Sequence, residues 1–262
     1  MLVLRPGALG DTLLAVPALR ALRRTYPRLT LGAHGGAARL LVSTGEVDAG
    51  FAFDDPSFAW LFRQDSEAPD DVVAWTSATN MPGLTRASVI AASRPPEMDR
   101  HCARYLLETL APLGINLDWD DAPLRVTPIP SLDVLVHPGS GSPAKNWPAE
   151  RFARLIDGLD APVRLVVGEA DATCAARVEA CLGYAVPRLE HPALEDLAAR
   201  LAGSRGYVGN DSGVSHLAGL CGARTIALFG PSDATVWRPI GPDVHVVSFE
   251  AEPEEIAGML RG

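Results

Sequence analysis

The sequence predicts an α/β protein with two lobes, each built on a parallel β-sheet. Two observations lead to this fold class. Short apolar runs typical of buried strands alternate with longer segments whose apolar residues recur at helical spacing, in both halves of the chain. The length of 262 residues also lies within the range, about 250–300 residues, at which a single hydrophobic core stops growing. One large domain or two small ones would fit, and the alternation of strands and helices favours two Rossmann-like lobes.

The first lobe is expected to begin with a strand, a glycine-containing loop and a helix. An apolar run at the start is followed by the small residues of Arg5–Gly10, and then by apolar residues at helical spacing. Gly114 follows a second such segment, as glycine often does just beyond a helix. The expected elements are the strands Met1–Leu4, Leu29–Ala33 and Val72–Trp75 and the helices Asp11–Arg24 and Arg100–Gly114.

The boundary between the lobes is expected where this alternation stops. Residues 115–131 are acidic and contain several prolines, a composition that suits a linker better than a core element. We therefore divide the chain into an N-terminal lobe, residues 1–128, and a C-terminal lobe, residues 129–262. The second lobe is expected to contain the strands Asp133–Val136, Val163–Val167, Gly206–Val208 and Thr225–Phe229 and the helices Ala149–Leu159, Ala170–Leu182, Leu194–Ala202 and Ser212–Cys221.

Three loops that follow predicted strands are the best candidates for a ligand site. They are Arg5–Asp11, His137–Trp147 and Gly209–His216, and each is rich in small residues and meets a helix start. In open parallel sheets, ligands bind beyond the carboxyl ends of the strands. Glycine lets the backbone approach a ligand closely, and the N–H groups and dipole of a helix N-terminus favour a phosphate. The loops therefore predict phosphate binding without a metal, although neither a P-loop nor a dinucleotide-binding fingerprint is present.

The Gly209–His216 loop has a structural and a functional interpretation. In the structural one, Asp211 or Ser212 caps the next helix and Gly213 permits close packing. In the functional one, Ser212 and Gly213 offer hydroxyl and amide donors to a diphosphate while Asp211 orients the loop. His216, one helical turn after Ser212, would add a donor on the same face.

Two charged residues also have competing interpretations. Lys145 could be a solvated loop cation, but it shares its loop with Gly139, Ser140 and Gly141. A diphosphate needs a counter-charge, and a chain of net charge −9 has few cations to spare, so we favour phosphate binding by Lys145. Asp11 could be the N-cap of the first helix or a general base that accepts a proton from a hydroxyl, and the two roles are compatible.

Composition and charge argue against several other classes of protein. The net charge of −9 and the pI near 5.1 supply no electrostatic footprint for nucleic acid. Four cysteines without a C-x-x-C pair predict free thiols, and a first strand that starts at once leaves no leader segment, so a cytoplasmic protein is expected. Apolar stretches fall short of the ~20 residues of a membrane-spanning helix. We expect at most peripheral contact with a membrane, at the inner face of the cytoplasmic membrane.

Four parts of the chain resemble, in the same order, motifs of glycosyltransferase family 9, the ADP-heptose:lipopolysaccharide heptosyltransferases. They are Val3–Asp11 with Pro17–Leu22, His137–Gly141 with Lys145–Pro148, Gly209–Gly213 with His216–Ala218, and Ala227–Asp233. The resemblance covers both ends of the chain and nearly all of the C-terminal half. It implies a GT-B architecture, in which two Rossmann-like lobes with parallel sheets face each other across a cleft. The donor would bind to the C-terminal lobe and the acceptor to the N-terminal one.

The resemblance also implies an inverting glycosyltransferase that uses neither a cofactor nor a metal. Asp11 would be the catalytic base, Gly10 would belong to the acceptor-side loop, and a nucleotide sugar such as ADP-heptose would be the donor. Asp118–Asp120 matches the D-x-D metal motif of other glycosyltransferases, but it lies in the predicted linker and not at a strand end. The implied donor-binding residues are Ser140, Gly141, Lys145, Glu169, Asp211, Ser212, Gly213 and His216, with Asp171 as the alternative to Glu169.

The resemblance implies a role in the assembly of a lipopolysaccharide core or a related glycan, but the first lobe leaves the identity of the acceptor open. Typical family members are longer, and the shortfall falls in the N-terminal lobe, where residues 40–85 contain Arg63 as their only basic residue. A glycan, a glycolipid or a small molecule is the expected acceptor. Two other functions fit the donor loops: an accessory protein that binds a nucleotide sugar without transferring it, and a two-lobe epimerase.

Overall fold

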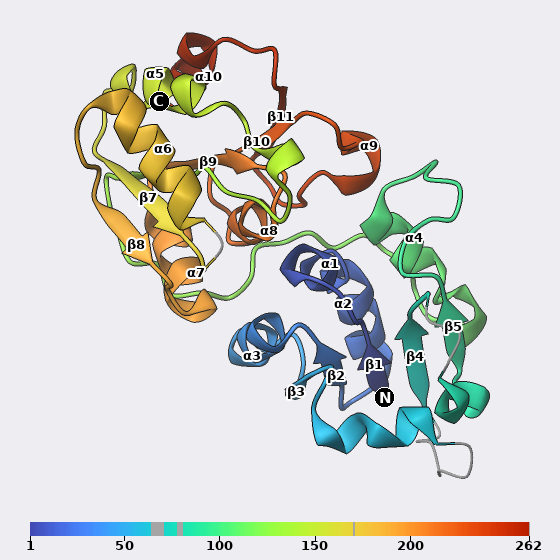
Figure 1. Cartoon of the computed structure of the whole chain (residues 1–262). Coiled ribbons are helices and arrows are strands. Elements are labelled where there is room, and N and C mark those ends of the chain that lie inside the picture. The colour runs from blue at the N-terminus through green and yellow to red at the C-terminus, as the bar shows by residue number, and fades with distance from the viewer. Residues whose placement is uncertain (64–70, 78–80, 170, 262) are drawn as a thin grey trace. The chain divides into compact units, whose positions relative to one another are not determined.

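The computed structural model describes residues 1–63, 71–77, 81–169 and 171–261 (Figure 1). The chain divides into two compact units, Met1–Asp121 and Ala122–Gly262, so the division falls inside the acidic linker segment. Each unit contains one sheet whose paired strands are parallel. The predicted α/β class with two parallel sheets is confirmed.

The first unit is built on a five-stranded sheet of order β3-β2-β1-β4-β5. The central strand β1 is buried along its whole length, and α3 packs against β2 and β3. The elements are β1 Leu2–Leu4, α1 Leu9–Leu13, α2 Val16–Thr25, β2 Thr30–Ala33, α3 Gly35–Ser43, β3 Ala49–Ala52, β4 Val72–Trp75, β5 Val89–Ala91 and α4 Cys102–Glu108, with 3₁₀ helices at Pro56–Phe62, Pro82–Arg86 and Ala111–Leu113. Part of the segment 40–85, on which the expected acceptor class rests, lies outside the described residues.

The single helix predicted over Asp11–Arg24 is wrong, because α1 ends at Leu13 and α2 begins at Val16. Pro17 explains the interruption. It lies in the first turn of α2, where a backbone N–H has no partner within the helix, whereas inside one continuous helix it would remove the bond to the Leu13 carbonyl. Asp11 therefore belongs to a separate five-residue helix directly after the first loop.

The second unit is built on a six-stranded sheet of order β11-β10-β9-β6-β7-β8. Its central strands β6, β9 and β10 are buried throughout, and Phe152 of α5 is buried against them. The predicted helix Ala170–Leu182 begins at Ala172, and Ala170 lies outside the described residues. The elements are β6 Val134–His137, α5 Ala149–Asp157, β7 Val163–Val167, α6 Ala172–Leu182, β8 Arg188–Glu190, α7 Leu194–Gly203, β9 Gly206–Asn210, α8 Gly213–Leu220, β10 Thr225–Phe229, α9 Ala234–Trp237, β11 Val244–Ser248 and α10 Pro253–Met259, with a 3₁₀ helix at Pro143–Lys145.

The strands that the sequence pattern did not predict are β3, β5, β8 and β11, and all four lie at the edges of the two sheets. Edge strands are covered on fewer sides, so they need no continuous apolar run. In β8 the pattern is Arg-Leu-Glu, and in β11 only two of the five residues are even half-buried. The hydrophobic signal on which the prediction rests is weak in such strands.

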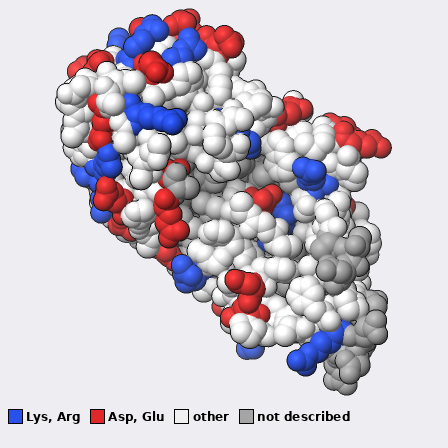
Figure 2. Space-filling view, viewed as in Figure 1, with Lys and Arg blue, Asp and Glu red and all other residues white. Residues whose placement is uncertain are grey.

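No described helix has the length and apolar character needed to cross a bilayer. On the face shown in Figure 2, Arg and Lys side chains are interspersed with Asp and Glu, and the described residues form no broad basic area there.

Candidate functional site

The carboxyl ends of three neighbouring strands bring together the loops of the second unit that were predicted to bind a ligand. The sheet order β9-β6-β7 places β6 between the other two strands. His137 is the last residue of β6, Asn210 is the last residue of β9, and Gly168 directly follows β7. Loops that are far apart in sequence therefore meet at the carboxyl ends of the strands, where parallel sheets bind their ligands.

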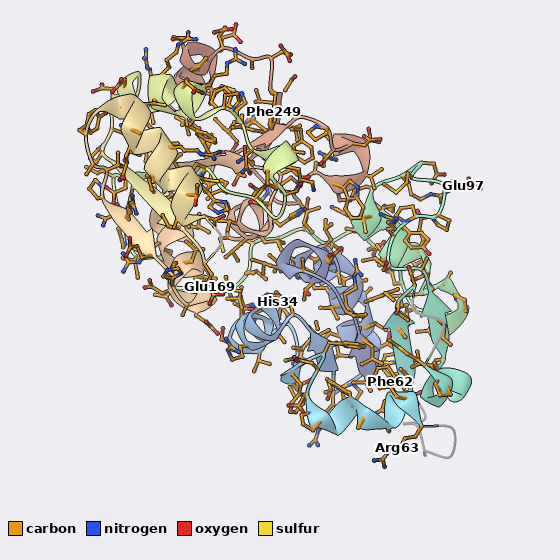
Figure 3. All side chains as sticks on the ribbon, in the orientation of Figure 1. His34, Phe62, Arg63, Glu97, Glu169 and Phe249 are labelled. Carbon is orange, nitrogen blue, oxygen red and sulfur yellow. The ribbon has the colours of Figure 1, made fainter. Side chains whose placement is uncertain are left out.

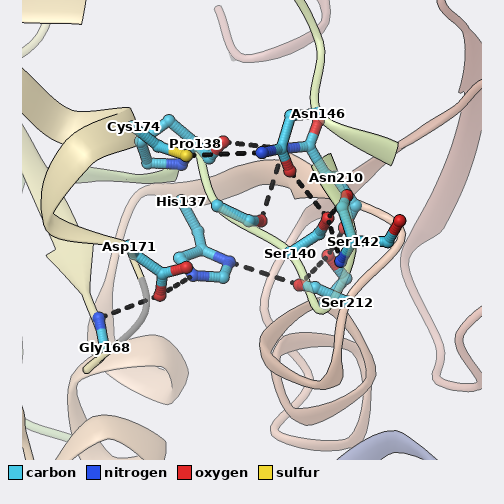
Figure 4. Close-up of polar contacts among 12 residues, drawn as sticks. His137, Pro138, Ser140, Ser142, Asn146, Gly168, Asp171, Cys174, Asn210 and Ser212 are labelled. Carbon is cyan, nitrogen blue, oxygen red and sulfur yellow. Dashed lines mark hydrogen bonds and ion pairs between the residues drawn. The ribbon is translucent and has the colours of Figure 1, made fainter. Parts of the chain in front are cut away.

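A buried chain of hydrogen bonds joins these loops (Figure 4). His137 Nε2 lies 2.9 Å from Asp171 Oδ2, and His137 Nδ1 lies 3.2 Å from Ser212 Oγ. The exposed fractions are 3% for His137, 8% for Asp171 and 9% for Ser212. This series of hydrogen bonds thus runs from Asp171 in the loop after β7, through His137 at the end of β6, to Ser212, which precedes α8.

The Asp171 carboxylate is held by the backbone as well as by His137. Its Oδ2 atom also accepts a hydrogen bond from the Gly168 N–H at 2.9 Å. Burial acts to raise the pKa of Asp171, but the hydrogen bonds from His137 and Gly168 act in the opposite direction, and the pKa lies below its ordinary value. At neutral pH the carboxylate is therefore ionised and can only accept hydrogen bonds.

Two glycines leave the space that this carboxylate fills. A Cβ atom on Gly139 would overlap the Asp171 carboxylate, and one on Gly168 would lie 2.8 Å from Oδ2. We expect Gly139→Ala to reduce the free energy of unfolding by about 1–3 kcal/mol, the usual cost of overpacking. Urea denaturation measures the loss.

The matched control is Gly141→Ala in the same loop. A Cβ atom there meets no described atom within 4 Å, so the change should stay within about 0.5 kcal/mol. Equal losses in the two variants would contradict the assignment of Gly139 as a space-making residue.

Helix α8 begins shortly after β9, at the carboxyl ends of these strands. Ser212 is its N-cap residue, yet its side chain makes no capping hydrogen bond. The structural interpretation of this loop, in which Ser212 caps the helix, is therefore wrong, since the hydroxyl contacts His137 instead. Uncapped N–H groups and the helix dipole make a favourable place for an anion.

The ammonium group of Lys145 contacts Asp211, the residue directly before the N-cap of α8. Lys145 Nζ donates to Asp211 Oδ2 at 2.7 Å, with Asp211 7% and Lys145 38% exposed at the side chain. Lys145 is the only lysine of the sequence, whose other basic residues, histidine apart, are 22 arginines. A lysine carries a compact point charge on a flexible stem, whereas arginine is a planar fork. The pair anchors a positive charge while leaving part of it accessible.

Asn210 fixes the two large loops to each other, a role that the sequence analysis did not predict. Its Oδ1 accepts from the Trp147 N–H at 2.9 Å, and its Nδ2 donates to the Pro138 carbonyl at 2.9 Å. Trp147 itself is a packing residue, because it is buried edge-on against Phe152 and its indole donates to the Phe249 carbonyl. The only sequence signal for Asn210 was its position two residues after the predicted strand Gly206–Val208.

The first loop of the first unit holds an ion pair between a buried arginine and a partly exposed aspartate. Arg5 is 1% exposed, and its Nη2 lies 3.1 Å from Oδ1 of Asp11, which is 33% exposed at the side chain. Asp11 Oδ2 accepts from the Ala8 N–H at 3.0 Å. Gly7 has φ of +139°, and a Cβ atom there would lie 2.9 Å from Asp11 Oδ2, so only glycine suits this turn. Each carboxylate oxygen of Asp11 accepts one of these two hydrogen bonds and has capacity for a second, and Gly10 is buried.

The remaining predicted residues occupy different places in the second unit. Ser140 is engaged within its own loop, where its hydroxyl lies 2.6 Å from Asn146 Oδ1, and Gly141 is exposed. His216 is buried one turn into α8. Glu169 is exposed in the loop after β7 (Figure 3). Its alternative, Asp171, belongs to the buried series of hydrogen bonds. Gly213 is the first residue of α8.

The D-x-D sequence Asp118–Asp120 has its second carboxylate occupied by cations. Asp120 Oδ1 lies 3.1 Å from the Arg20 guanidinium, and its Oδ2 lies 2.9 Å from that of Arg24. A carboxylate neutralised by two arginines is a poor ligand for a divalent metal. Among the described residues, no cluster of three histidine, cysteine or acidic side chains has metal-binding geometry.

Known structures share the fold. The chain superposes on E. coli ADP-heptose lps heptosyltransferase II with a TM-score of 0.76 at 17% identity, over 99% of this chain and 96% of that one. It superposes on E. coli heptosyltransferase WaaC with ADP with a TM-score of 0.75 at 18% identity, over 99% of this chain and 98% of that one. It superposes on a family 9 glycosyl transferase from Veillonella parvula DSM 2008 with a TM-score of 0.76 at 19% identity, over 94% of this chain and 85% of that one. A comparison with curated proteins gave no match.

The model of glycosyltransferase family 9 (heptosyltransferase) matches residues 113–257, which is more than half of the chain. The match spans the loops that carry His137, Lys145, Asp171 and Ser212. Together with the two parallel sheets and the structural likeness, it confirms the resemblance drawn from the four motifs. This chain is a GT-B glycosyltransferase that belongs to glycosyltransferase family 9, the heptosyltransferase family.

Proposed function

We propose that this enzyme transfers a sugar, heptose being the first candidate, from a nucleoside diphosphate donor to an acceptor hydroxyl, with inversion and without a metal. The observation that carries the proposal is the uncapped N-terminus of α8 beside Lys145. The N–H groups and the ammonium can donate hydrogen bonds to a leaving diphosphate, and the helix dipole also stabilises its negative charge. Because these groups supply positive charge themselves, the proposal assigns no step to a metal.

Two structures of similar proteins support a nucleotide-sugar donor. E. coli WaaC is described with ADP and with ADP-2-deoxy-2-fluoro heptose. We propose that Ser140, Gly141, Lys145, Asp211, Ser212, Gly213 and His216 bind the donor in residues 129–262, with Glu169 or Asp171 on the nucleoside.

The chemical step is assigned to Asp11, in the proposed acceptor-binding lobe of residues 1–128. Its carboxylate removes the proton from the acceptor hydroxyl while that oxygen attacks the anomeric carbon. The bond between this carbon and the diphosphate oxygen breaks on the opposite face, which inverts the configuration. Negative charge then accumulates on the diphosphate, where the α8 N–H groups and Lys145 stabilise it. The Arg5 guanidinium fixes the orientation of Asp11.

A transfer assay tests the proposal. Purified enzyme is incubated with ADP-heptose, other ADP-sugars and UDP-sugars, together with glycan, glycolipid and small-molecule acceptors, in the presence and absence of EDTA. We expect release of nucleoside diphosphate that depends on the acceptor, persists in EDTA and gives a product with the opposite anomeric configuration by NMR. Donor binding without transfer would instead identify an accessory protein. Conversion of the donor sugar without an acceptor would identify an epimerase.

A further inference from the structure

The Ser212 side chain is turned away from the helix that it precedes. A serine at an N-cap position usually accepts a hydrogen bond from the N–H of the second or third helical residue, here Val214 or Ser215. The Ser212 backbone is extended, with φ of −151° and ψ of 164°, as an N-cap requires, yet the side chain makes no such bond. A group other than the helix therefore holds this hydroxyl.

That group is His137, and its protonation pattern follows from Asp171. An ionised carboxylate only accepts hydrogen bonds, so the proton shared between Asp171 Oδ2 and His137 belongs to Nε2. In the neutral ring, Nδ1 is then an acceptor, and the Ser212 hydroxyl, 3.2 Å away, donates to it. The ring cannot turn without losing its bond to Asp171, which the Gly168 N–H also holds.

The surrounding hydroxyls reinforce this direction. Ser215 Oγ donates to the Asn210 carbonyl, which can only accept. Burial raises the pKa of Tyr207, so its phenol keeps its proton and donates to Ser215 Oγ at 3.0 Å. Ser215 Oγ is then an acceptor on its remaining side, and it lies 3.4 Å from Ser212 Oγ. Both near neighbours of the Ser212 hydroxyl draw its proton inward, away from the N-terminus of α8. Ser212 would therefore contact a diphosphate through its backbone N–H and not, as the sequence analysis expected, through its hydroxyl.

The Ser215 N–H already donates to the Ser212 carbonyl at 3.1 Å. We propose that Asp171 and His137 are positioning residues that hold the Ser212 side chain off α8, so that the N–H groups of Gly213 and Val214 stay free for the donor diphosphate. The inference rests on the proposed function of that helix as the diphosphate site. Without His137, rotation about χ1 would bring Ser212 Oγ onto the N–H groups of its own helix. Self-capping would then compete with the ligand.

The experiment compares His137→Gln with His137→Asn by calorimetry. The glutamine amide can reach Asp171 in place of Nε2 but not Ser212, whereas the asparagine amide can take the place of Nδ1 beside Ser212. The probes are ADP, UDP and pyrophosphate, the last being common to all nucleoside diphosphates. For the tightest probe, we expect His137→Gln to raise Kd about fivefold, the change that corresponds to a helix cap of ~1 kcal/mol. We expect His137→Asn to recover most of the affinity.

A double-mutant cycle separates this role from general damage to the fold. In a Ser212→Ala background no self-cap can form, so adding His137→Gln should cause no further loss of affinity. A fivefold loss in both backgrounds would overturn the inference, as would equal affinities of wild type and His137→Gln. If the wild type binds none of the three probes, the proposed function fails and the inference fails with it. Thermal unfolding of each variant establishes that it is folded.

Discussion

Replacement of Asp11 by Asn is expected to reduce kcat for sugar transfer by roughly 10²–10⁴-fold, the contribution typical of a general base. Asparagine keeps the size of the side chain and can still accept from the Arg5 guanidinium, but it cannot take a proton from an acceptor hydroxyl. The affinity for the nucleotide should change little, because the groups proposed to bind the diphosphate belong to the second unit. A coupled assay for released nucleoside diphosphate measures kcat, and calorimetry measures nucleotide affinity.

Asp54→Asn provides the matched control for this variant. Asp54 is an exposed aspartate of the same unit, and its replacement removes one negative charge without touching the Arg5–Asp11 pair. We expect its kcat to equal that of the wild type. Undiminished transfer by Asp11→Asn would remove Asp11 from the mechanism, and a fall in both variants would indicate an effect of charge alone.

Replacement of Lys145 by Ala is expected to weaken nucleotide binding by roughly 10- to 100-fold, because hydrogen bonds to charged groups contribute about 1.5–3 kcal/mol. The loss has two parts. The ammonium no longer neutralises the diphosphate, and Asp211, only 7% exposed at its side chain, is left with an uncompensated charge beside the α8 N-terminus. Calorimetry with ADP and UDP measures Kd.

Lys145→Arg distinguishes charge from shape at this position. It keeps the positive charge but replaces a compact ammonium by a larger planar group, so an intermediate loss is expected. Because Lys145 is the only lysine, an amine-selective reagent offers a second measurement: its targets are Lys145 and the N-terminal amine. Bound nucleotide should slow modification of Lys145 and leave the N-terminus unaffected, as peptide mass mapping would show. Equal rates at Lys145 with and without nucleotide would contradict its role.

The sequence predicted the interior strands of both sheets and missed all four edge strands. Strands such as Val163–Val167 and Thr225–Phe229 are apolar along most of their length, because other elements cover them. Edge strands such as Arg188–Glu190 carry no such pattern. The break between α1 and α2 was predictable in principle from Pro17, whose ring interrupts a helical ladder.

The site was predicted unevenly for a related reason. Loops rich in glycine and serine that follow a strand indicate a candidate ligand site from local composition alone. The segments around Lys145 and Ser212 could therefore be found from the sequence. The partners of those residues could not. Asp171 was only the second choice for the nucleoside contact, and its contact with His137 has no signature apart from Gly139 and Gly168, which make room for it.

The sequence by itself determined two parallel α/β lobes and the family motifs, and it pointed to three loops as candidates for phosphate binding, because periodicity and glycine content are local properties. Only the tertiary structure decided which of these residues touch. His137 is 75 positions from Ser212 and 34 from Asp171, and Lys145 is 66 from Asp211. They meet because β6 lies between β9 and β7, and a strand order is a choice among packings of the whole chain.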